Sequence, residues 1–122
     1  MKREDFEKLV MKALKDLPRV FKDRLENVDV VIENRPTIEL ANAVDASHRR
    51  MVMGLYHGVP LDRRTHQYGN VMPDKISIYQ VNIERVCRTD EEIVRLVTHT
   101  VHHELAHHFG ISDKRLKDLG IY

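Results

Sequence analysis

The sequence predicts one α+β domain spanning residues 1–122, with helices before and after a group of short strands. Three observations predict it: an amphipathic helix pattern at the N-terminus, three stretches with strand character in the middle, and a clearly capped helix near the end. A chain of 122 residues can bury one core but is too short for two. Every motif should therefore belong to the same fold.

Two helices are expected first. Over residues 3–17, apolar side chains recur at spacings of three and four residues with charges between them, which is typical of a core-packing helix. These apolar positions are Phe6, Leu9, Val10, Ala13, Leu14 and Leu17. Pro18 should end this helix and can begin the next one, which continues at helical spacing to about Asn27.

The central part of the chain should form the sheet. The stretch "VDVVIE" (28–33) is rich in β-branched residues, and "MVMGLYHG" (51–58) and "KISIYQV" (75–81) have the pattern of two further strands. Residues 37–50 stay open between a weak helix and an excursion on the surface. Residues 59–74 should form a long polar loop, and loops of this length in compact domains tend to be functional or disordered.

The last helix has a well-defined start and end in the sequence. Thr89 and Glu92 have the spacing of a capping box, and the acidic residues around them suit the positive end of a helix. The helix should run to Phe109, because Gly110 then allows a left-handed stop.

Composition argues against several classes of function. The 20 Lys and Arg residues nearly cancel the 19 Asp and Glu residues, so no overall field exists to gather nucleic acid or an anionic membrane surface. The apolar runs are short and the N-terminus is charged, so we expect a soluble protein that stays in the cytoplasm. The single cysteine, Cys87, excludes an internal disulfide and a thiolate metal cluster, and should be a half-buried apolar residue.

The stretch "HHELAHHFGISD" (102–113) carries the strongest chemical signal. His103 and His107 are one helical turn apart, about 6 Å along the axis and about 40° around it, so both imidazoles can meet one metal ion. Two neutral ring nitrogens favour zinc, and Glu104 is placed as the general base of a metallohydrolase. Gly110 lets the chain turn, and Asp113 follows as the third ligand, which leaves one coordination position open.

The extended pattern is more specific than a bare HExxH, which arises by chance in many helices. A solvated, histidine-rich helix without metal would not explain the linked Glu, Gly and Asp offsets. His99 lies about 12 Å from His107 along the axis, too far for one ion with bonds of about 2 Å, so it is expected to support the site or face solvent. His102 and His108 lie on neighbouring faces of the helix, where packing or exposure is expected.

At this motif the sequence resembles the zincin-like metallopeptidases, and more closely a small bacterial family of minimal, matrix-metalloprotease-like zincins. The segments that carry the resemblance follow that family's order: a helix ending in "DLP", "NVDVVIE" followed by "RP", "MGLYHGVPL", "PDKISIYQ" and "THTVHHELAHHFGISD". The resemblance covers most of the chain. It implies a mixed sheet of about three or four strands packed on N-terminal helices and a C-terminal active-site helix. It also implies zinc at His103, His107 and Asp113, with Glu104 catalytic.

The chain departs from the larger metzincin pattern at the metal. Metzincins have a third histidine where Asp113 stands and a methionine turn farther along, whereas no methionine follows Asp113 here. The floor beneath the metal must therefore be built differently. The negative charge of Asp113 should also make the ion a weaker Lewis acid.

Zincins generally hold a peptide as an added strand along a sheet edge, and "MGLYHG" or "KISIYQ" could supply that edge. Tyr56, His57, Tyr68 and Tyr79 are candidate donors to an oxyanion by their chemistry alone, and none is assigned as catalytic.

The favoured function is a zinc-dependent peptidase that acts on exposed or unfolded peptide segments, with one zinc ion per chain and Glu104 as the base. Two alternatives stay open: a metal-binding module with a regulatory or partner-binding role and little turnover, and a subunit whose site another chain completes. A site of two histidines and one aspartate also tolerates other first-row divalent metals.

Overall fold

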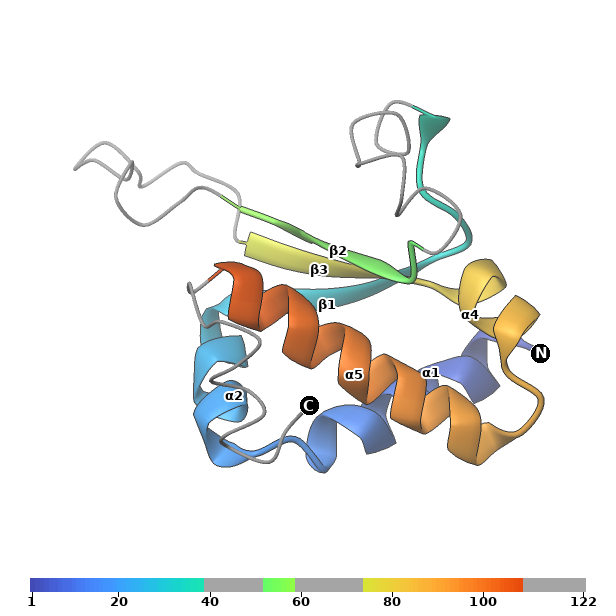
Figure 1. Ribbon diagram of the computed structural model, residues 1–122, viewed down its shortest axis with the longest axis horizontal. Coiled ribbons are helices and arrows are strands. Elements are labelled where there is room, and N and C mark those ends of the chain that lie inside the picture. Colours follow the sequence, from blue (N-terminus) through green and yellow to red (C-terminus); the bar gives the residue numbers. More distant parts are fainter. Residues whose placement is uncertain (39–51, 59–73, 109–122) are drawn as a thin grey trace.

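The computed structural model of the protein describes residues 1–38, 52–58 and 74–108 (Figure 1). Several sequence predictions concern residues outside these ranges: most of the open segment 37–50, most of the polar loop 59–74, the Gly110 stop, Tyr68 and the predicted ligand Asp113. The described part confirms the α+β class, since helices pack on one face of a mixed sheet (Figure 1).

The two N-terminal helices form as predicted. Helix α1 spans Arg3–Lys15 and helix α2 spans Arg19–Arg24, followed by a 3-10 turn, η1, at Leu25–Asn27. Helix α1 is shorter than the predicted range of 3–17, because Pro18 disfavours a helical conformation in the residue before it. Leu17 is nevertheless buried, so the apolar stripe continues into the core beyond the end of the helix.

Three strands make up the described sheet: β1 (Val28–Glu33), β2 (Gly54–His57) and β3 (Asp74–Tyr79). Their order is β1-β3-β2, with β3 parallel to β1 and antiparallel to β2. Within the described residues, β2 is therefore an edge strand. It is shorter than the predicted strand over 51–58.

Helix α4 (Gln80–Val86) corrects the prediction that a strand extends over 75–81. Strand β3 ends at Tyr79, and the next residue already begins the helix. Long-range contacts hold the turn: the Asn82 side-chain amide donates to the Val52 carbonyl at 2.7 Å, and the Val81 N–H donates to the Asn34 carbonyl at 3.1 Å. Tertiary contacts thus override the local alternation that suggested a longer strand.

Helix α5 (Asp90–His108) is the longest element and begins as predicted. The Glu92 N–H donates to the Thr89 hydroxyl at 3.2 Å, which is one half of the expected capping box. In a capping box the Glu92 carboxylate would accept from the N–H of Thr89 itself. Here it accepts from the N–H of the preceding residue, Arg88, at 2.7 Å. No helix of the described part is long and apolar enough to cross a membrane.

The core lies between the sheet and three helices, α1, α2 and α5, which share one face of the sheet (Figure 1). Ile76 and Ile78 of the central strand point toward this layer and are fully buried. The other fully buried apolar residues of the cluster are Phe6, Ala13, Phe21, Ile83, Val97, Val101, Leu105 and Ala106. Helix α5 packs on α1, and its C-terminal half lies under the sheet, where it contacts strands β2 and β3 (Figure 1).

Candidate metal centre

His103 and His107 lie close together on the C-terminal half of helix α5. Their ring centroids are 4.1 Å apart and the ring planes are tilted by 52°. Zinc bonds imidazole nitrogen at about 2.0–2.1 Å, so two rings at this separation can reach one ion. Leu105 and Ala106, between them in sequence, are fully buried, which fixes the rotation of the helix and leaves both imidazoles at its accessible side. The donor chemistry and spacing of this pair fit a zinc ion.

The third predicted ligand, Asp113, lies outside the described residues. Within residues 1–38, 52–58 and 74–108, no group of three or more His, Cys, Asp or Glu side chains is placed to hold a metal ion. The structure therefore brings two predicted ligands together, and Asp113 stays a prediction.

Glu104 is held by the edge strand β2. Its Oε2 atom accepts a hydrogen bond from the backbone N–H of Tyr56 at 3.1 Å. The Tyr79 N–H donates to the Met53 carbonyl at 2.9 Å, so strand alternation directs the N–H of Tyr56 away from β3, toward the edge of β2 that pairs with no other described strand. The carboxylate thus reaches from the helix to the sheet edge, beside both histidines. Sequence reasoning missed this contact, because a backbone donor leaves no signature in residue type.

Gly54 allows helix α5 to approach strand β2 closely. A Cβ atom at this position would lie 2.7 Å from the Thr100 Cγ2 atom and 2.8 Å from the Ser77 carbonyl oxygen. The Thr100 side chain is restricted by its β-branch, and the Ser77 oxygen belongs to the backbone, so neither can move freely. The absence of a side chain at Gly54 therefore sets the distance across which Glu104 reaches β2.

Replacing Gly54 with alanine is expected to lower the free energy of unfolding by about 1–3 kcal/mol, since the added methyl group overpacks the strand-helix contact. Urea unfolding would measure it. Thr100→Ser removes the Cγ2 atom but keeps a hydroxyl for the hydrogen bond to the Leu96 carbonyl, so combining it with Gly54→Ala should recover part of the loss. A Gly54→Ala variant as stable as the wild type would show that the contact is not tight.

The remaining described histidines of α5 pack against aromatic rings. His102 is buried and lies 4.8 Å from the Phe21 ring, and His108 stacks on Tyr56 at 3.9 Å. This packing agrees with the expectation for both. The rings of His99 and His103 are 6.1 Å apart and nearly parallel, which places His99 beside the first predicted ligand.

The described candidate oxyanion donors lie on two different faces of the sheet. Tyr79 and His57 alternate with residues that face α5, so they lie on the opposite face of the sheet from the histidine pair. Burial, together with the charge of Glu33, raises the pKa of the Tyr79 hydroxyl, and burial with the nearby Lys75 lowers the pKa of His57. Tyr56 faces α5, but its hydroxyl bonds Asp74. None of these three is assigned as an oxyanion donor.

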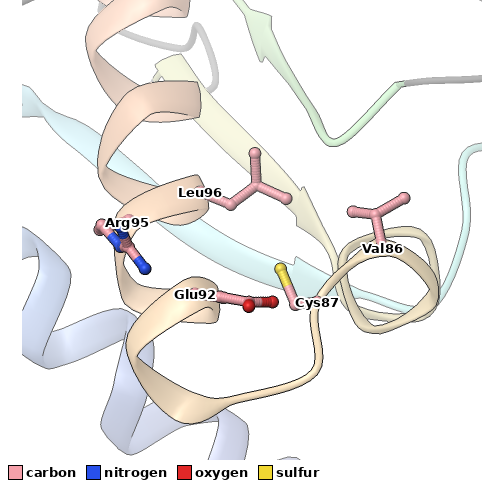
Figure 2. A pocket seen from close by; sticks show the side chains of 5 residues that line it. All are labelled: Val86, Cys87, Glu92, Arg95 and Leu96. Atoms are coloured by element: carbon pink, nitrogen blue, oxygen red, sulfur yellow. The ribbon is translucent and has the colours of Figure 1, made fainter.

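A separate pocket lies where α4 meets α5, far along the helix from the histidine pair. It is lined by Val86, Cys87, Glu92, Arg95 and Leu96, and the Glu92 carboxylate points toward the Cys87 thiol (Figure 2). Cys87 is half-buried against the core, as predicted. Burial, and to a lesser degree the charge of Glu92, raises the pKa of the Cys87 thiol above its usual range.

Because a raised pKa keeps the thiol protonated near neutral pH, Cys87 should react with iodoacetamide more slowly in the folded protein than in the urea-unfolded chain. Glu92→Gln should increase the rate in the folded state, since it removes the charge but keeps an oxygen to accept from Arg88. Alkylation followed by mass spectrometry at several pH values would measure both rates. A folded-state rate equal to that of the unfolded chain would contradict the raised pKa.

Helix α5 thus carries two adjacent imidazoles and a carboxylate under the edge of a mixed sheet. The family model for zincin-like metallopeptidases matches residues 25–121, so the chain belongs to that family. No curated protein matches the chain.

Proposed function

We propose that the protein is a zinc-dependent peptidase, with His103, His107 and Asp113 as the zinc ligands and Glu104 as the general base. One observation carries the proposal: the Glu104 carboxylate is held at the sheet edge by the Tyr56 N–H, beside a pair of imidazoles whose centroids are 4.1 Å apart. Membership of the zincin-like metallopeptidase family supports the same chemistry. If helix α5 only packed against the sheet and bound no metal, Glu104 would not need to extend to strand β2.

When bound, the zinc ion would polarise the scissile carbonyl and bring the pKa of the attacking water to about 7. Glu104 then needs only to accept one proton from that water and deliver it to the leaving amine. The backbone N–H of Tyr56, which donates to Oε2, restrains the carboxylate that would carry this proton.

The substrate is proposed to be an exposed or unfolded peptide segment. Strand β2 is an edge strand within the described residues, and an extended peptide can add to such an edge through main-chain hydrogen bonds that do not depend on sequence, using the outward groups of β2 other than the Tyr56 N–H that Glu104 occupies. The balanced charge of the chain favours peptides over nucleic acid or a membrane surface, and action in the cytoplasm is part of this proposal.

Cleavage of a quenched-fluorescent peptide pool and of unfolded casein by the zinc-supplemented protein would test the proposal. Activity should disappear with a chelator and return with added zinc. Zinc binding without any cleavage would favour the alternative of a regulatory or partner-binding module. Cleavage that appears only with another protein added would favour a subunit completed in trans.

A further inference from the structure

The backbone and the side chain of Tyr56 each donate a hydrogen bond to a different carboxylate. Its backbone N–H donates to Glu104 Oε2 at 3.1 Å, and its phenolic hydroxyl donates to Asp74 Oδ2 at 2.7 Å. Because one residue carries both bonds, fixing the ring also restricts the position of the N–H that holds the carboxylate. The side chain of an edge-strand residue is thereby coupled to the predicted base.

The Tyr56 side chain belongs to a cluster with Asp74 and His108, here called the anchor cluster. The rings of Tyr56 and His108 stack with centroids 3.9 Å apart and planes inclined by 16°. The His108 Nε2 atom lies 3.9 Å from Asp74 Oδ2. The anchor cluster thus joins β2, the first residue of β3 and the last residue of α5, which directly follows the predicted ligand His107.

The anchor cluster is tightly enclosed. Asp74 is only 9% exposed, and a carboxylate with so little access to water requires partners such as the Tyr56 hydroxyl. Gly58 leaves the necessary room, since a Cβ atom there would lie 2.6 Å from the Asp74 carboxylate and 2.8 Å from the Tyr56 ring. The Tyr56 ring is therefore confined between Asp74, His108 and the backbone of Gly58.

The Tyr56 N–H points away from β3, so contacts other than the strand ladder must restrain it. In the described residues β2 pairs with β3 on one side only, and at Tyr56 the backbone N–H faces the unpaired side. The ladder to β3 therefore does not fix this N–H through a bond of its own. The ring contacts, together with Glu104, supply that restraint.

We propose that Tyr56 and Asp74 are positioning residues for Glu104, acting through the Tyr56 N–H. This inference rests on the proposed function, in which Glu104 is the base. Tyr56 does not touch the reacting atoms in this assignment. Its contribution is to hold the carboxylate in the orientation for proton transfer, where small displacements reduce the rate.

The test uses the zinc-supplemented full chain with Tyr56→Phe, which removes the bond to Asp74 and keeps the stacked ring, and with Asp74→Leu. Asp74→Asn is the rescue variant, because its amide oxygen can still accept from Tyr56. Ser77→Ala, which deletes a buried hydroxyl from the other face of β3, is the matched control. Amide hydrogen exchange at residue 56 and steady-state cleavage kinetics are measured for each variant.

Tyr56→Phe and Asp74→Leu should speed exchange at residue 56 by about 3- to 10-fold, the size expected for one weakened hydrogen bond, while exchange in the central strand β3 stays unchanged. The same variants should lower kcat by a similar factor and leave KM and zinc content unchanged, and Asp74→Asn should restore both readouts. Ser77→Ala should match the wild type.

Unchanged exchange at residue 56 in Tyr56→Phe would overturn the proposal, whatever the activity. Faster exchange with unchanged kcat would also overturn it, because the anchor cluster would then serve stability alone. Failure of the proposed function is seen separately, as a wild-type protein that binds zinc but cleaves nothing. In that case faster exchange in Tyr56→Phe would still establish that the anchor cluster restrains the Glu104 contact.

Discussion

Glu104→Gln should retain zinc and lose peptide cleavage, with kcat/KM reduced by about 100- to 10,000-fold, the range that positioned general acid-base groups contribute. The substitution keeps the size of the side chain and an oxygen that can accept from the Tyr56 N–H, so the helix-strand contact should persist. Only the ability to take up a proton is removed. Metal analysis and steady-state cleavage of the same preparations would measure both properties.

Glu91→Gln provides the matched control, because Glu91 is an exposed acid in the first turn of the same helix. It removes the same charge from α5 and should leave cleavage unchanged. Equal cleavage by the wild type and Glu104→Gln would assign any observed hydrolysis to a contaminating protease or to chemistry that does not use this base.

The helices and the adjacency of the His103 and His107 rings could be predicted because their signals are local. The apolar spacing of α1, the cap at Thr89 and the single-turn separation of His103 and His107 each depend on residues within a few positions of one another. A structure predicted from such a local pattern forms when tertiary packing favours the same structure. Here the buried residues Leu105 and Ala106 keep the histidine side of α5 in place.

Helix α4 and the contact between Tyr56 and Glu104 could not be predicted, because both depend on residues that are far apart in the chain. Gln80 continues the strand alternation of Ile76 and Ile78, and only contacts from distant residues, such as that between Asn82 and Val52, favour a helix there. The Tyr56 N–H lies 48 positions from Glu104 in the chain. Which N–H of an edge strand points away from the neighbouring strand depends on register, and the sequence contains no local signal for it.

Loss of both helical histidines should abolish zinc binding. With only Asp113 left from the predicted set, the ion would have one protein ligand instead of three, and structural and catalytic zinc sites in proteins use three or four. His99→Ala is the matched control, because His99 lies on the same helix with its ring 6.1 Å from that of His103 and is not a predicted ligand. Asp113→Ala tests the ligand that lies outside the described residues.

The decisive measurement is elemental analysis of untagged protein after zinc is supplied and excess metal removed. Wild type and His99→Ala should hold about one zinc per chain, His103→Ala/His107→Ala should hold almost none, and Asp113→Ala should bind zinc more weakly. Absence of zinc from the wild type, or full retention by the double histidine variant, would contradict a metal centre on helix α5 and with it the proposed peptidase.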